Sequence, residues 1–139
     1  MTRFLPLVYA CAAMALLTIV VAVYMLSQRI GEMRTRKLKL AQMATSVELG
    51  KLESVRVADN FRNLFETPVL FYVACILAIV VGFASTAFIA MAWTYVGLRC
   101  VHSFIHCGYN HVRHRFYAFA ASLVVLVAMW VRLVAFVGA

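Results

Sequence analysis

The sequence predicts an all-α integral membrane protein, a bundle of four transmembrane helices. Of its 139 residues, 65% are hydrophobic and 13% are charged, whereas soluble domains are about 45–50% apolar and about 25% charged. The mean hydropathy of +0.93 agrees with this contrast. Such a composition excludes a disordered chain and an ordinary soluble enzyme. At about 150 residues per domain, residues 1–139 form a single unit.

The first helix is predicted over residues 4–28. The run from Phe4 to Gln28 carries no charge, and a membrane-spanning helix needs about 20 apolar residues. Because this run is too long for a secretory leader and no small-x-small cleavage site follows it, we expect it to stay as a helix. A polar segment over residues 29–54 comes next, and we expect it to lie in the cytosol.

The second and third helices are predicted over residues 55–82 and 86–109. The run from Thr67 to Leu98 is charge-free, too long for one comfortable span and too short for two. The stretch at residues 82–86 contains glycine, serine and threonine and predicts a tight turn in the middle of this run. Each helix must therefore extend outward beyond its apolar half.

The fourth helix is predicted over residues 112–136, since the apolar run at 116–131 spans only if its ends are extended. Basic residues then sort by side, because the two segments on one side carry eleven of the thirteen and the opposite side carries only Arg3 and Arg132. Cytoplasmic segments collect Lys and Arg. We therefore expect both termini on the non-cytosolic side, in the inner membrane if the protein is bacterial. The net charge of +8 then needs no nucleic-acid partner.

Two stripes of polar residues are predicted at membrane depth, each with the spacing of one helix face. The second helix contributes Asp59, Arg62, Asn63 and Glu66, and the third contributes Tyr95, Arg99, His102, His106, Tyr109 and Asn110. Ionisable residues inside a membrane are candidates for a functional site. The structural alternative is a pair between Arg99 and Glu66 that fixes the bundle, with Arg62 extending to the interface.

Two arginines stand where the fourth helix begins. Arg113 and Arg115 either reflect the basic bias of the cytosolic side or converge with the helix N-terminus on an anion.

Inside the second helix, Pro68 leaves a carbonyl near Leu64 without its helical donor, so that a kink is expected beside the polar stripe.

A metal or haem site is a competing hypothesis, because His102 and His106 stand at a ligand spacing of i, i+4. The chain has no HExxH and no CxxC motif. We therefore expect no metal, and we expect its four cysteines to be free thiols that pack as small hydrophobes.

Three motifs in order resemble the MAPEG family, the membrane-associated proteins in eicosanoid and glutathione metabolism. They are Arg62-Asn63-Leu64-Phe65-Glu66-Thr67-Pro68, then Tyr95 to Arg99 with His102, and then Asn110 to Arg115. The resemblance covers about residues 4–137. It implies a four-helix membrane protomer in a homotrimer, with glutathione between neighbouring subunits near the cytosolic side.

The resemblance also implies a function, namely a glutathione-dependent membrane transferase or peroxidase that acts on lipophilic electrophiles by thiolate attack. The implied glutathione-binding residues are Arg62, Asn63, Glu66, Arg99, His102 and His106. Either Arg113 or Arg115 would be the catalytic arginine that activates the thiol. The alternative is a non-catalytic membrane binding or scaffold protein, or an accessory subunit of a membrane complex, with the same fold. Membrane lipid and a lipophilic small molecule are the expected partners.

Overall fold

The computed structural model describes residues 2–36 and 54–138, which form helices and turns. A short 3-10 turn, Thr2–Phe4, leads into α1, Leu5–Arg36. The remaining helices are α3, Val55–Asn63; α4, Thr67–Val80; α5, Thr86–Cys107; and α6, Val112–Val137. Within these described residues, four segments are long and apolar enough to cross a membrane, because α3 and α4 together make one of them. The protein is thus a membrane four-helix bundle.

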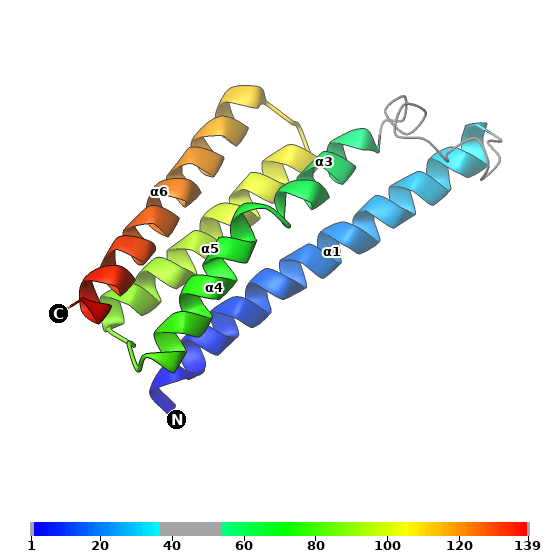
Figure 1. The fold of residues 1–139 in the computed structure, drawn as a ribbon. Coiled ribbons are helices and arrows are strands. Elements are labelled where there is room, and N and C mark those ends of the chain that lie inside the picture. Colours follow the sequence, from blue (N-terminus) through cyan, green and yellow to red (C-terminus); the bar gives the residue numbers. More distant parts are fainter. Residues whose placement is uncertain (1, 37–53, 139) are drawn as a thin grey trace.

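The helices run side by side, and both termini lie at the end of the bundle that also holds the α4–α5 turn (Figure 1). The α5–α6 turn lies at the other end. Helix α5 is the centre of the bundle, since it packs against α1, α3 and α6. This arrangement places α3 and the beginning of α6 on either side of the last turns of α5.

The first helix is longer than the predicted 4–28, because it continues to Arg36 and takes in residues expected in the cytosolic segment. The reason is that a charge marks where lipid ends, not where a helix ends, and Arg, Glu and Met favour helix about as well as Leu. Residues 37–53 of the predicted segment 29–54 lie outside the described residues.

The bundle has an apolar core that also holds several polar side chains, and its outer surface is apolar as well. Buried polar side chains include Asn60, Arg99, His102 and Ser103. Large apolar side chains are exposed along α1, α4, α5 and α6, with Val80 and Phe104 both 74% exposed. An apolar surface of this extent needs lipid to cover it.

Turn chemistry separates the spans. Gly82 has φ of 78°, and the amide of Phe83 donates to the carbonyl oxygen of Ala78 at 2.7 Å, which closes α4 in a left-handed glycine cap. Ser85 then caps α5, because its Oγ accepts from the amide of Phe88 at 3.2 Å. The predicted turn at 82–86 is where the structure has it.

The second span is interrupted at residues 64–66, and Pro68 is the second residue of the helix that follows. Proline lacks an N–H for the carbonyl oxygen of Leu64, and its ring crowds that oxygen. Glu66 takes a backbone conformation of φ −94° and ψ −87°, outside the helical region. The expected kink is therefore a complete break between α3 and α4.

Candidate functional site

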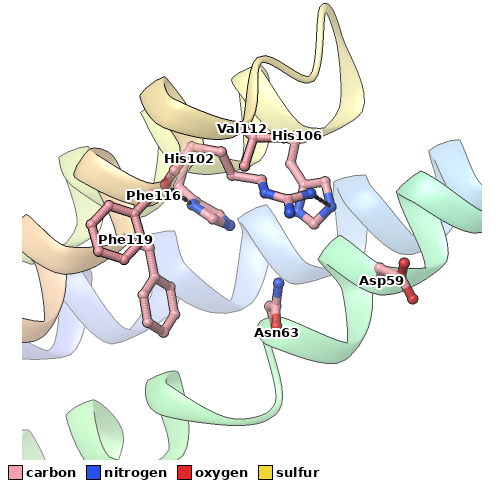
Figure 2. A pocket seen from close by; sticks show the side chains of 8 residues that line it. Asp59, Asn63, His102, His106, Val112, Phe116 and Phe119 are labelled. Atoms are coloured by element: carbon pink, nitrogen blue, oxygen red, sulfur yellow. Dashed lines mark hydrogen bonds between the residues drawn. The ribbon is translucent and has the colours of Figure 1, made fainter.

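A cavity of about 340 Å³ lies between α3, α5 and the beginning of α6, at the end of the bundle away from the termini (Figures 1 and 2). Its walls combine charged, polar and aromatic side chains. They are Asp59, Asn63, His102, His106, Val112, Arg115, Phe116 and Phe119. One half of the cavity can therefore bind a charged group, and the other half an apolar one.

Arg115 is the cation of this cavity. Its Nη1 donates to Nε2 of His106 at 2.9 Å and to Oδ1 of Asn110 at 3.1 Å. Arg115 is half-buried, whereas Arg113 is exposed and is not part of the cavity wall. Of the two arginines that the sequence left as alternatives, Arg115 and not Arg113 therefore lines the cavity.

The two histidines are held in opposite tautomers. His102 lies with Nδ1 3.1 Å from the carbonyl oxygen of Arg115, which can only accept, so Nδ1 carries the proton. His106 accepts from Arg115 at Nε2, so its proton is on Nδ1. Each of the two histidine residues is 2% exposed. The remaining ring nitrogens, Nε2 of His102 and Nδ1 of His106, have no hydrogen-bond partner among the described residues.

Arg99 lies behind the cavity, fully buried. Its Nη2 donates to the carbonyl oxygen of Asn63 at 3.0 Å, and its guanidinium carbon lies 5.6 Å from the centre of the Phe119 ring. In an unbroken helix the Asn63 carbonyl would accept from the amide of Thr67, and the break before Pro68 leaves it free. A cation at the C-terminal end of α3 is also favoured by the helix dipole.

The structure brings together part of the predicted set. Asn63, His102, His106 and Arg115 line the cavity. Figure 2 shows the Asn63 amide directed toward the two histidine rings, while the Asp59 carboxylate points away from them. Arg62 and Glu66 are exposed and stand outside the cavity wall.

One role and one residue were missed from the sequence. Asn110 was placed on the polar stripe, but its role in the turn was not predicted: it has φ of 48° and supplies one of the two acceptors that hold Arg115. Asn60 is fully buried, donating from Nδ2 to the Cys107 sulfur at 3.3 Å and accepting at Oδ1 from Ser103 at 3.4 Å. The signal for Asn60 was its register, because it stands three residues after buried Val57 on the inward face of α3.

Metal ligands are not gathered here. In residues 2–36 and 54–138, no group of three or more His, Cys, Asp and Glu side chains could hold a metal ion. The four cysteines are free thiols.

Comparison with known proteins gives one match. The model of the MAPEG family matches residues 7–135 of the chain. Neither the search of curated proteins nor the search of solved structures returned a match.

Proposed function

Because the chain belongs to the MAPEG family, we propose that it is a glutathione-dependent membrane transferase or peroxidase that acts on lipophilic electrophiles by thiolate attack. The observation that carries the proposal is Arg115, a guanidinium fixed by two hydrogen bonds in a cavity that is half polar and half aromatic. A free thiol of pKa about 8.5 is mostly protonated at neutral pH, and a nearby guanidinium lowers that pKa. The thiolate is the nucleophile that attacks an electrophilic carbon or a peroxide oxygen.

The cavity offers separate surfaces for the two reactants. Asn63 and the two histidines present polar groups beside Arg115, where an anionic tripeptide is favoured. Phe116 and Phe119 provide the apolar surface for an electrophile that enters from lipid. Arg99 has a supporting role in this proposal, since it holds the end of α3 and so the position of Asn63.

Arg62 and Glu66 require a neighbouring subunit in this proposal. Both are exposed beside the cavity, so they bind glutathione only if a second chain closes the site over them. We therefore propose a homotrimer with glutathione between subunits. Cross-linking in native membranes tests this, with a trimer band expected and a monomer alone as the contradicting result.

The cavity is proposed to face the cytosol. Arg29 and Arg34 of α1, Arg56 of α3 and Arg113 of α6 are exposed or half-buried. The last part of α1, α3 and the beginning of α6 lie at this end of the bundle (Figure 1), and basic residues concentrate on the cytosolic side of membrane proteins. Reporter fusions at the two termini test the orientation, and a cytosolic reporter at either terminus would contradict it.

The central experiment is a titration of glutathione into the purified protein in lipid nanodiscs, followed by thiolate absorbance in the ultraviolet. S-methylglutathione is the matched control, because it keeps the tripeptide but cannot form a thiolate. We expect saturable binding of both and a thiolate band with glutathione alone. Binding without that band would favour a non-catalytic binding protein, and no binding at millimolar glutathione would refute the proposal.

A further inference from the structure

His102 has one ring nitrogen engaged and the other free. The hydrogen bond from Nδ1 to the carbonyl oxygen of Arg115 fixes the ring at the wall of the cavity. Nε2 then carries a lone pair and no proton, and it is buried without a partner among the described residues. A buried acceptor without a donor is costly, so the vacant lone pair points to a ligand that brings a proton.

His106 cannot fill the same role. Its own lone pair, on Nε2, already accepts from Arg115 at 2.9 Å. Its free nitrogen, Nδ1, carries the proton and is a donor. His102 is therefore the one of the two rings whose hydrogen-bond arrangement lets it accept a proton.

The charges around His102 make its protonation depend on a bound anion. Arg99 and His106 are on its own helix, Arg115 packs against it from α6, and Asp59 faces the cavity from α3 with its carboxylate turned away (Figure 2). The two guanidinium groups oppose a positive charge on the His102 ring while no ligand is bound, so Nε2 keeps its lone pair until then. A thiolate formed beside Arg115 supplies the negative charge that offsets the imidazolium.

We infer that His102 is a catalytic residue, the general base that takes the proton of the bound thiol, while Arg115 stabilises the thiolate. The inference rests on the proposed function. The S–H bond breaks, the proton passes to Nε2, and sulfur keeps the electron pair. Sulfur then bonds to the electrophilic carbon as the bond from that carbon to the leaving group breaks. The leaving group departs with its electron pair, and His102 gives the proton to it or, where it is a stable anion such as chloride, to water. Cysteine–histidine ion pairs stabilise thiolates in the same way.

Proton counting tests the inference. If His102 keeps the proton, thiolate forms without release of a proton to the medium; if water takes it, each thiolate releases one. Calorimetry of glutathione binding in two buffers of different ionisation enthalpy measures this count, with S-methylglutathione subtracting protons unrelated to the thiol. Ultraviolet absorbance measures the thiolate formed in the same samples.

Two variants form a matched pair. His102→Asn keeps an N–H near the position of Nδ1, and so the contact with the Arg115 carbonyl, but removes Nε2. His102→Gln places its amide near Nε2 and removes the Nδ1 donor. We expect His102→Asn to bind glutathione, to release a proton with each thiolate it forms, and to lose at least about a hundred-fold in the rate of reaction with a chlorodinitrobenzene probe.

The outcomes separate the two proposals. Thiolate without proton release in the wild type, and with release in His102→Asn, supports the inference. Release of one proton for each thiolate formed in the wild type overturns the inference and leaves the proposed function intact, with solvent as the proton acceptor. Absence of thiolate in the wild type overturns both. The wild-type count decides the question even if neither variant folds.

Discussion

Asn110 links the turn between α5 and α6 to the arginine of the cavity, and its two roles can be separated by substitution. Its backbone is left-handed, with φ of 48°, and its side-chain oxygen accepts from Nη1 of Arg115 at 3.1 Å. Asn110→Gly keeps the left-handed backbone and removes the acceptor. Asn110→Ala removes the acceptor and also strains the backbone, whereas Asn110→Asp keeps an acceptor and tolerates the conformation.

The expected magnitudes follow from these two roles. A left-handed backbone costs a residue with a Cβ about 1–2 kcal/mol, and the greater flexibility of glycine disfavours its folding by about 0.5–1 kcal/mol. Asn110→Ala should therefore be about 1 kcal/mol less stable than Asn110→Gly. Both lose the bond to the Arg115 guanidinium, about 1–2 kcal/mol for a charged donor that is half-buried. Asn110→Asp should be as stable as the wild type.

Two assays measure the effects separately. Thermal unfolding in one detergent reports stability, and the ultraviolet titration of bound glutathione reports how well Arg115 is placed. We expect the stabilities of the glycine and alanine variants to differ while their thiol titrations shift together. Equal stability of the two variants would refute the left-handed turn. A thiol titration unchanged in both would refute the positioning of Arg115 by Asn110.

Three further predictions use the same preparations. Arg115→Ala should raise the pKa of the bound thiol by about two units, because a guanidinium at about 4 Å contributes about 4 kcal/mol at an effective dielectric constant of about 20 and half-burial reduces this. Arg113→Ala is the control and should leave the thiol titration unchanged. Equal pKa shifts in the two variants would contradict the assignment of Arg115. Phe71→Ala removes a fully buried ring and should cost about 3 kcal/mol of unfolding free energy, against no change for exposed Val80→Ala; similar values for both would contradict the packing. Asn60→Ala leaves the buried Ser103 hydroxyl and the half-buried Cys107 thiol without this partner and should cost about 1–3 kcal/mol in the same unfolding assay. A neutral result would count against this network.

The spans were predictable because lipid imposes one requirement on every residue that meets it. Three apolar runs, one of them divided by the turn at residues 82–86, were enough to predict four spans, and the described residues contain these four. The end of α1 was not predictable from charge, because the helix runs past Arg29 and Glu32 to Arg36. Side chains that leave the membrane can still favour helical backbone.

The site was predictable only where the helical period is unbroken. On α5, one uninterrupted helix, the spacing correctly placed Arg99, His102 and His106 on an inward face, and all three are buried. On the preceding span, the same argument grouped Glu66 with Asn63 as if they shared a helix. Because the helix breaks at residues 64–66, the residue spacing of α3 does not continue to Glu66. Asn63 therefore lines the cavity, whereas Glu66 is exposed.

The choice between Arg113 and Arg115 shows what remains beyond periodicity. Two residues advance about 200° around a helix, so one arginine faces the cavity and the other must turn away. The phase is decided where α6 begins, by a turn that needs glycine at 108, because a Cβ there would stand 2.8 Å from the Phe104 carbonyl oxygen. Asn110 completes that turn, and its side chain also accepts a hydrogen bond from Arg115. The same turn therefore sets the phase of α6 and holds the arginine that faces the cavity. Because the sequence has an arginine on each of two opposite faces of α6, either helical phase would bring one candidate arginine to the cavity. The turn before α6 determines which of the two arginines that is.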